Sequence, residues 1–437
     1  MYAYKRNTYF DSRRNVKKLS KQLKLYIFEC LFHLLTIKIL YLEYAENIVF
    51  ISVMLKELKR MIEVKEFYNE LLNNNIDFFT GVPDSLLKSF CAYIKENVSS
   101  EKNIISANEG NAIGIAAGYH LATKKIGLVY MQNSGLGNAL NPLVSLTDKL
   151  VYSIPVLLIV GWRGEPNKKD EPQHKKQGLV TIEILDILSI KYDILENNTS
   201  NDEMRKKIRK ANNYMKENNE PYALVVKKDT FDEYQIKYDK TLDLEMTRED
   251  AIEILISNAK EKSVVVSTTG MASRELFELR ERYNGDHSKD FLTVGSMGHA
   301  SQIALGIALS RKDRDVYCID GDGALIMHLG GLAIIGNQNA DNLKHILINN
   351  GAHDSVGGQE TVGFKIDTLA IAKACGYKKF YSCSSRDELV RLSEKISNEK
   401  GPIFLEIKVK KGSRKNLGRP TTTPIENKEM FMKFLEN

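Results

Sequence analysis

The stretch Val316-Tyr-Cys-Ile-Asp-Gly-Asp-Gly-Ala-Leu325 decides the fold of this chain. Its first four residues form a short apolar run that is typical of a buried parallel strand. Gly321 and Gly323 flank Asp322, allow a tight turn and let the backbone approach a ligand closely. A helix-like segment follows, and its free N–H groups would face the turn, which suits phosphate binding. The stretch therefore predicts a strand, a turn and a helix with an anion site at the turn.

A second apolar strand, His345–Ile348, ends in Asn349-Asn350-Gly351. Asp322 and Asn350 are 350 − 322 = 28 positions apart, and each stands just beyond the end of a strand. One carboxylate, one amide oxygen and a carbonyl of the following turn would supply three hard oxygen ligands. Mg²⁺ that also binds a diphosphate and a water needs such a set. Gly-Asp-Gly alone would be any strand-to-helix turn, so the paired asparagines carry the prediction.

Gly-Asp-Gly followed about 25 residues later by Asn-Asn is similar to the cofactor motif of thiamine diphosphate-dependent enzymes. The resemblance implies that Asp322, Asn350 and the carbonyl of Ala352 bind Mg²⁺. It also implies that the turn binds the cofactor through Gly321, Gly323 and Ala324.

Composition restricts the class of protein. The chain has 437 residues, 43% hydrophobic and 27% charged, as expected for a soluble globular protein with two sizeable domains. The net charge of +6 is mild and partly concentrated near the N-terminus, so we do not infer nucleic-acid binding. Five cysteines without a CxxC pair indicate buried thiols in a reducing cytoplasm, not a disulfide framework.

Residues 1–60 differ from the rest. Leu23–Leu55 is apolar but is interrupted by charges such as Glu29 and Lys38, so it contains no run of about 20 uncharged residues for a membrane span. The segment is either an amphipathic helix on a partner or membrane surface, or the product of a start assigned too early. We favour the second, with Met61 as the true start, because every recognisable motif follows it.

From Val64 onward, strands and helices alternate, which predicts α/β architecture with doubly wound parallel sheets. The domains are predicted at 61–232 and 245–437, with a charged linker at 228–246. The predicted strands are 76–79, 104–106, 127–131, 156–160, 222–226, 263–267, 316–319, 345–348 and 403–407. Two such halves resemble the pyrimidine-binding and diphosphate-binding domains of thiamine diphosphate enzymes, without the middle domain of larger members.

The resemblance assigns further residues to the cofactor. Glu109 in Ala107-Asn-Glu-Gly110 matches the glutamate that hydrogen-bonds the aminopyrimidine ring and promotes removal of the C2 proton. Met297 matches the bulky residue that bends the cofactor, the Gly295 carbonyl would meet the 4′-amino group, and the loop of Thr269 would lie near the cofactor. From the residues alone, Glu109 would be a helix-start glutamate and Met297 a core methionine.

Three strings resemble the phosphonopyruvate decarboxylase family: Gly81–Leu87, Gly161–Glu165 with Asp170–His174, and Asn350–Gln359. The implied reaction is decarboxylation of 3-phosphonopyruvate to phosphonoacetaldehyde and CO₂, a step of phosphonate (2-aminoethylphosphonate) biosynthesis. Arg163 is a candidate for the substrate phosphonate because its planar cation can make paired hydrogen bonds. Further candidates are Ser85 and His174 for substrate, and Asp84 and His353 for proton transfer.

Alternatives remain open. Sulfopyruvate decarboxylases are similar, and another 2-oxo acid could be the substrate. A non-catalytic relative is disfavoured because Glu109, Asp322 and Asn350 are intact. An NAD oxidoreductase is disfavoured because no G-x-G-x-x-G follows the first strand of either half. The resemblance also implies a homodimer or higher homo-oligomer, with the cofactor between the first domain of one subunit and the second domain of another.

Deleting residues 1–60 is expected to leave decarboxylation intact, because every motif above lies beyond Met61. The measurement is the kcat of the truncated and full-length chains at matched oligomer size. Loss of activity in a truncated protein that is folded and oligomeric would show that the extension contributes to the site.

Overall fold

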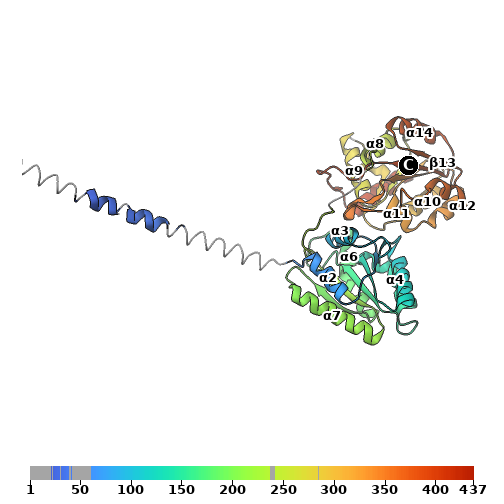
Figure 1. Ribbon diagram of the computed structural model, residues 1–437. Coiled ribbons are helices and arrows are strands. Elements are labelled where there is room, and N and C mark those ends of the chain that lie inside the picture. Colours follow the sequence, from blue (N-terminus) through green and yellow to red (C-terminus); the bar gives the residue numbers. More distant parts are fainter. Residues whose placement is uncertain are drawn as a thin grey trace, which may run out of the picture. The chain divides into compact units, whose positions relative to one another are not determined.

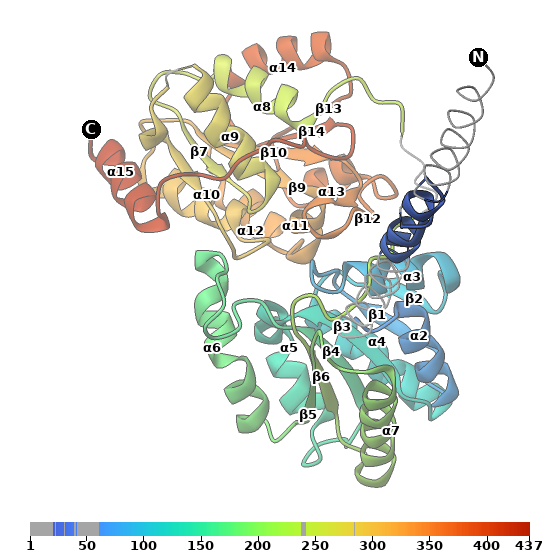
Figure 2. The same ribbon diagram turned by 90° about the vertical axis from the view of Figure 1, so that its left-hand side faces the viewer.

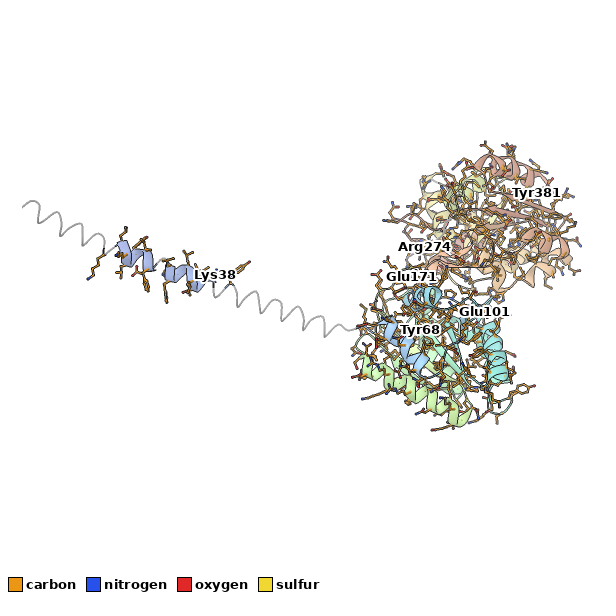
Figure 3. The ribbon with its side chains drawn as sticks, in the orientation of Figure 1. Lys38, Tyr68, Glu101, Glu171, Arg274 and Tyr381 are labelled. Atoms are coloured by element: carbon orange, nitrogen blue, oxygen red, sulfur yellow. The ribbon has the colours of Figure 1, made fainter. Side chains whose placement is uncertain are left out.

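The computed structural model describes residues 21, 23–29, 31–38, 41, 61–236, 242–283 and 285–437. The chain divides into two units, Met1–Arg60 and Met61–Asn437. In the first unit the described residues are helical and exposed, for example Lys38 (Figure 3). Among the residues that the structure describes, no helix has the length and apolar character that crossing a bilayer requires. Most of the segment on which the two interpretations of residues 1–60 depend lies outside the described residues.

The second unit contains two six-stranded parallel sheets (Figure 2). The first has the order β2-β1-β3-β4-β6-β5 and the second β13-β14-β10-β9-β7-β8. Renumbered within each half and read from the β2 and β8 edges, both orders are 2-1-3-4-6-5, so the second half repeats the topology of the first. The strands of the two sheets are β1 (Phe79–Gly81), β2 (Asn103–Ile105), β3 (Gly127–Gln132), β4 (Val156–Gly161), β5 (Lys191–Leu195), β6 (Tyr222–Val226), β7 (Val264–Ser267), β8 (Asp290–Leu292), β9 (Val316–Gly321), β10 (Leu343–Asn349), β13 (Lys379–Cys383) and β14 (Ile403–Lys408).

Helices cover both faces of each sheet (Figures 1 and 2). The helices of the first half are α2 (Val64–Asn73), α3 (Lys88–Asn97), α4 (Glu109–Thr123), α5 (Leu136–Pro142), α6 (Pro172–Ile187) and α7 (Asn201–Asn218). Those of the second half are α8 (Arg248–Ser257), α9 (Met271–Arg282), α10 (Ala300–Ser310), α11 (Asp322–Met327), α12 (Gly331–Gln338), α13 (Thr368–Ala374), α14 (Arg386–Asn398) and α15 (Pro424–Glu436). A short hairpin of β11 (Ala352–His353) and β12 (Gln359–Glu360) follows β10.

Each sheet is sandwiched between two apolar clusters. In the first half, α2, α3 and α7 bury Phe67, Phe90 and Ile208 against one face, and α4, α5 and α6 cover the other. In the second half, α8, α9 and α14 pack on one face, and α10, α12 and α15 on the other. The predicted doubly wound α/β fold is therefore confirmed. The continuous apolar runs of the central strands follow from their burial on both faces.

Three strands that the sequence pattern did not predict, β5, β8 and β13, lie at sheet edges. The side chains of β5 and β13 are mostly only partly buried, as at Tyr381 of β13 (Figure 3), whereas two of the three residues of β8 are buried. Because an edge strand pairs on one side only, it needs no continuous apolar run. The predicted domain limits, 61–232 and 245–437, stay a prediction. Ile62 forms a parallel bridge to Phe231, so the two ends of the first half meet.

The order of the strands indicates at which edge of each sheet a ligand would bind. In each sheet the order reverses between the first and third strands, β1 and β3 or β7 and β9, and ligands of open α/β sheets bind beyond the carboxyl ends there. Ile348 of β10 stands opposite Gly321 of β9, so the residues after both strands emerge at the same edge.

Candidate active site

Asp322, the first residue of α11, is 3% exposed and lies beside the end of β10. Its Oδ2 accepts a hydrogen bond from Thr361, and its carboxylate lies close enough to the Asn350 backbone N–H to be stabilised by it. Burial, with a smaller contribution from the nearby Asp354, raises the pKa of the Asp322 carboxyl to about 6 against these hydrogen bonds. The structure thus brings Asp322 and Asn350 together, as the spacing of their motifs predicted.

The donor set fits a divalent cation. Asp322 offers a carboxylate, Asn350 an amide Oδ1, and the neighbouring Ala352 a backbone carbonyl, all oxygen ligands of the kind Mg²⁺ prefers. Asp322 is buried near a second carboxylate, Asp354, and a cation would relieve the cost of this arrangement. A Cβ on Gly363 would lie 2.8 Å from Asp322 Oδ2. The Gly363 backbone therefore packs directly against one side of the Asp322 carboxylate, where a side chain would overlap it.

Asp354 was missed by the sequence analysis and holds Asn350 in place. The Asn350 Nδ2 donates to Asp354 Oδ2 at 2.6 Å, and Arg248 Nη1 donates to the same oxygen at 3.0 Å. Arg248 is itself held by Glu275 through bonds of 2.7 and 3.0 Å. This buried chain, Glu275–Arg248–Asp354–Asn350, fixes the amide of a candidate metal ligand. Arg248 and Glu275 lie on α8 and α9, far in sequence from Asn350, so no local sequence pattern predicts their role.

Met297 and His353 converge on the Gly-Asp-Gly turn. A Cβ on Gly323 would lie 2.7 Å from His353 Cε1 and 3.3 Å from Met297 Cε, so only glycine allows both side chains to approach here. Burial lowers the pKa of the His353 imidazole to about 4, which keeps the ring neutral near pH 7. The sequence placed both residues near the cofactor, and the structure places them next to each other.

The remaining predicted cofactor residues are Ala324, Thr269 and Gly295. Ala324 is buried in α11, and Thr269 is half-buried in the loop after β7. A Cβ on Gly295 would lie 3.1 Å from Gln173 Cβ, so its loop meets the start of α6. Their cofactor roles stay predictions.

Glu109 opens α4 and is 5% exposed. The Asn138 Nδ2 donates to its Oε2 at 2.7 Å, while its Oε1 lies against Gly135, where a Cβ would stand only 2.4 Å away. Burial raises the pKa of the Glu109 carboxyl, and the Asn138 hydrogen bond offsets part of the rise. The preceding Asn108 donates to the Met327 carbonyl at 3.1 Å, which links α4 to the end of α11 within one chain.

Asp84 lies beyond β1 and is fully buried. Burial raises the pKa of its carboxyl to about 6, partly offset by the Leu86 backbone N–H at 3.0 Å and by Arg163. A Cβ on Gly161, at the end of β4, would lie 2.1 Å from Asp84 Oδ2. Ser85 donates weakly to Asp84 Oδ1 at 3.5 Å and accepts from Arg163 Nη1 at 2.8 Å.

Arg163 directs its fork at Asp170. Its Nε and Nη2 donate to the two Asp170 oxygens at 2.9 and 2.5 Å. A two-pronged contact with a phosphonate through that edge would require Asp170 to move. The substrate role of Arg163 stays a prediction. Only the N–H groups of Nη1 and Nη2 that do not bond Asp170 or Ser85 remain to donate to a substrate. His174 is buried nearby, and burial, with Arg163, lowers the pKa of its imidazole to about 4.

A second buried network lies beneath the turn. Asp320 Oδ1 accepts from the Gly321 N–H at 2.9 Å, and its Oδ2 lies 3.3 Å from His345 Nε2. The His345 Nδ1 lies 2.8 Å from the Tyr377 hydroxyl. This chain fixes the peptide before Asp322 and was not visible in the sequence, since its members come from β9, β10 and the turn after α13.

Two family descriptions match the chain. Residues 64–185 match the N-terminal TPP binding domain of thiamine pyrophosphate (thiamine diphosphate) enzymes, and residues 268–407 match their C-terminal TPP binding domain. Together with the two sheets and the site above, these matches define a thiamine diphosphate enzyme.

Three relatives match this chain over nearly their whole length, and they indicate to which group of thiamine diphosphate enzymes it belongs. The phosphonopyruvate decarboxylase of Streptomyces viridochromogenes is 33% identical over 390 residues, 86% of this chain and 95% of that protein. That of Streptomyces hygroscopicus is 33% identical over 86% of this chain and 94% of its own length. The sulfopyruvate decarboxylase of Methanosarcina acetivorans is 28% identical over 83% of this chain and 94% of its own. The chain belongs to the thiamine diphosphate-dependent decarboxylase family that contains phosphonopyruvate decarboxylases.

Asp354→Ala is expected to weaken Mg²⁺-dependent binding of thiamine diphosphate by about 10- to 100-fold, because the Asn350 amide and the buried Arg248 lose their shared partner. Calorimetric titration with Mg²⁺ present measures the affinity for thiamine diphosphate. Asp322→Ala, which should abolish binding, sets the lower limit. Asp341→Ala, which removes the exposed partner of Lys378, is the matched control. Unchanged affinity in folded Asp354→Ala would contradict this role.

Asp84→Asn is expected to change how stability depends on pH. The folded chain raises the pKa of Asp84 from 3.8 to about 6, so it holds the proton more tightly than the unfolded chain. That contribution is present at low pH and is lost as pH rises through 6, by about 3 kcal/mol in all. Relative to wild type, the variant should therefore gain unfolding free energy between pH 4 and 7 in urea titrations. Parallel pH profiles would show that Asp84 has its ordinary pKa.

Proposed function

We propose that the chain decarboxylates 3-phosphonopyruvate to phosphonoacetaldehyde and CO₂, a step of phosphonate biosynthesis, with thiamine diphosphate and Mg²⁺ bound. The observation that carries the proposal is 33% identity to a phosphonopyruvate decarboxylase across 95% of that protein. The buried oxygen ligands around Asp322 and the buried carboxyl of Glu109 support the cofactor and the metal. Free thiols at Cys91, Cys318, Cys375 and Cys383 support a reducing, cytoplasmic setting.

When bound, thiamine diphosphate supplies an acceptor for the electron pair that is released with CO₂. The chain's own residues prepare for this. The Glu109 Oε1 lies against the Gly135 backbone, and the raised pKa of the Glu109 carboxyl favours sharing a proton with a ring nitrogen. Asn138 holds the other oxygen and fixes the direction of the carboxyl.

Proton transfer to the product is assigned to groups near Gly323 and β1. His353 is neutral near pH 7 and lies directly on the turn, so it can accept or relay a proton there. Asp84, with a pKa of about 6, is suited to exchange a proton near neutral pH.

Sulfopyruvate is the alternative substrate. The sulfopyruvate decarboxylase relative also covers most of this chain, at 28% identity. In Methanocaldococcus jannaschii the enzyme has alpha and beta subunits, which match 39% and 36% of this chain. Both substrates carry a second anion on C3 of pyruvate, so a site for one resembles a site for the other.

The decisive assay compares phosphonopyruvate, sulfopyruvate and pyruvate with Mg²⁺ and cofactor present, following phosphonoacetaldehyde by ³¹P NMR and CO₂ release. We expect kcat/KM for phosphonopyruvate to exceed that for pyruvate by about one to two powers of ten, because the site binds a second anion. Glu109→Gln should bind cofactor yet lose about 10²-fold or more in kcat. Faster turnover of sulfopyruvate would replace the proposed substrate with the alternative.

We also propose that the active unit is a homodimer or a multiple of it. The outer face of α4 exposes Gly114 and Gly118, and that of α10 exposes Gly306, with space around all three for an added Cβ. Leu121 and Leu309 on the same helices are 70% and 40% exposed. Uncovered small and apolar helix faces are suited to close helix packing between subunits.

Gly114→Arg should dissociate the assembly without unfolding the chain, because the position has open space and arginine favours helix more than glycine does. Light scattering at assay concentration measures the mass. Lys206→Glu, on the exposed face of α7, is the control. A wild-type chain that is monomeric and fully active would contradict the proposal.

A further inference from the structure

Gln359 is a buried amide without a hydrogen-bond partner. Its side chain is 2% exposed, and neither Oε1 nor Nε2 meets a partner among the described residues. Most buried polar atoms in proteins are paired, because leaving one unpaired destabilises the fold. An amide whose oxygen and nitrogen are both unpaired, beside a candidate active site, therefore indicates that it binds a ligand.

The strands that carry Gln359 are held in place. The Gly358 N–H donates to the His353 carbonyl at 3.0 Å, and the Thr361 N–H donates to the Gly351 carbonyl at 2.9 Å. Asp354, between the two strands, is held by Arg248. A Cβ on Gly357 would lie 2.9 Å from Gln359 Nε2, so glycine at 357 makes the room in which the amide lies. The unpaired amide is thus part of a fixed hairpin.

The pairing of β11 and β12 gives the amide its direction. Gln359 stands opposite His353 in an antiparallel pair, and residues in that relation point to the same face of the hairpin. His353 lies on Gly323 beside Met297. The Gln359 side chain therefore points to the side of the hairpin on which His353, Met297 and the Gly-Asp-Gly turn meet.

We propose that Gln359 binds the substrate, its Nε2–H₂ donating to an anionic oxygen of the 2-oxo acid. This rests on the proposed function. The carboxylate and the ionised phosphonate oxygens of such an acid accept hydrogen bonds, so the amide nitrogen is the complementary group. Asp170 already occupies the fork of Arg163, which leaves the anion in need of further donors. The carboxylate and the phosphonate share this chemistry, and the substrate series distinguishes them.

The test uses Gln359→Met, which keeps length and volume but removes both polar atoms, and Gln359→Glu, which places a negative charge against the anion. We expect kcat/KM for phosphonopyruvate to fall about 10- to 100-fold in Gln359→Met and further in Gln359→Glu. Calorimetric affinity for 3-phosphonopropanoate, which has both anions and no keto group, should fall in parallel. Thermal stability and thiamine diphosphate affinity should hold in Gln359→Met, since methionine keeps the volume and no hydrogen bond among the described residues is lost. Glu360→Gln, whose side chain instead pairs with Lys95, is the matched control.

The outcomes separate cleanly. A loss for every 2-oxo acid assigns the contact to the carboxylate, and a loss confined to phosphonopyruvate assigns it to the phosphonate. Wild-type kcat/KM and 3-phosphonopropanoate affinity in a stable Gln359→Met would overturn the proposal and assign the amide to ordered water. If Gln359→Met is unstable, Gln359→Glu decides by the same measurements. If the wild-type enzyme prefers another 2-oxo acid, the proposed substrate fails, while the same variants still test Gln359 on that acid.

Discussion

Burying Asp322 is the constraint on which the second half of the molecule depends. A carboxylate at 3% exposure, near the carboxyl group of Asp354, is costly unless hydrogen bonds and a cation compensate. The structure supplies the hydrogen bonds from Thr361 and the Asn350 backbone, and it neutralises Asp354 with the buried Arg248. The hairpin after β10 folds back over the turn because these contacts require it. The same hairpin then carries His353 and Gln359 to the site.

Four of the functional side chains share a second feature, in that each packs against a glycine. A carboxyl or imidazole group that is buried against backbone needs a neighbour without a Cβ, because any Cβ would overlap it. Such contacts position a side chain by shape and exclude water from one side of it. They also explain Gly135 and Gly363, which belong to no recognised motif. The pairs are Glu109 on Gly135, Asp84 on Gly161, His353 on Gly323 and Asp322 on Gly363.

The two halves have one topology and divide the chemistry. Both sheets order their strands 2-1-3-4-6-5, so each offers its ligand edge at the same reversal of strand order. At that edge the first half presents carboxyl groups of raised pKa, Glu109 and Asp84, which suit proton exchange. The second half presents Asp322 and Asn350, which suit a cation and a diphosphate. Repeating a fold therefore did not repeat its function, because the loops and not the strands carry the side chains.

The sequence by itself determined the cofactor motif and most of the central strands, although the first was predicted at 76–79 and lies at Phe79–Gly81. Strands buried on both faces must be apolar throughout, and the Asp322–Asn350 spacing follows from two neighbouring strands ending at one edge. It did not reveal the edge strands β5, β8 and β13, because β5 and β13 are partly exposed and need no apolar run, and β8 has only three residues. Only the tertiary structure decided that Asp170 occupies the fork of Arg163 and that Arg248 and Glu275 hold Asn350 through Asp354. It also showed that the Gln359 amide has no hydrogen-bond partner among the described residues. These facts depend on contacts between side chains that are far apart in the sequence, and a local sequence pattern cannot predict such contacts.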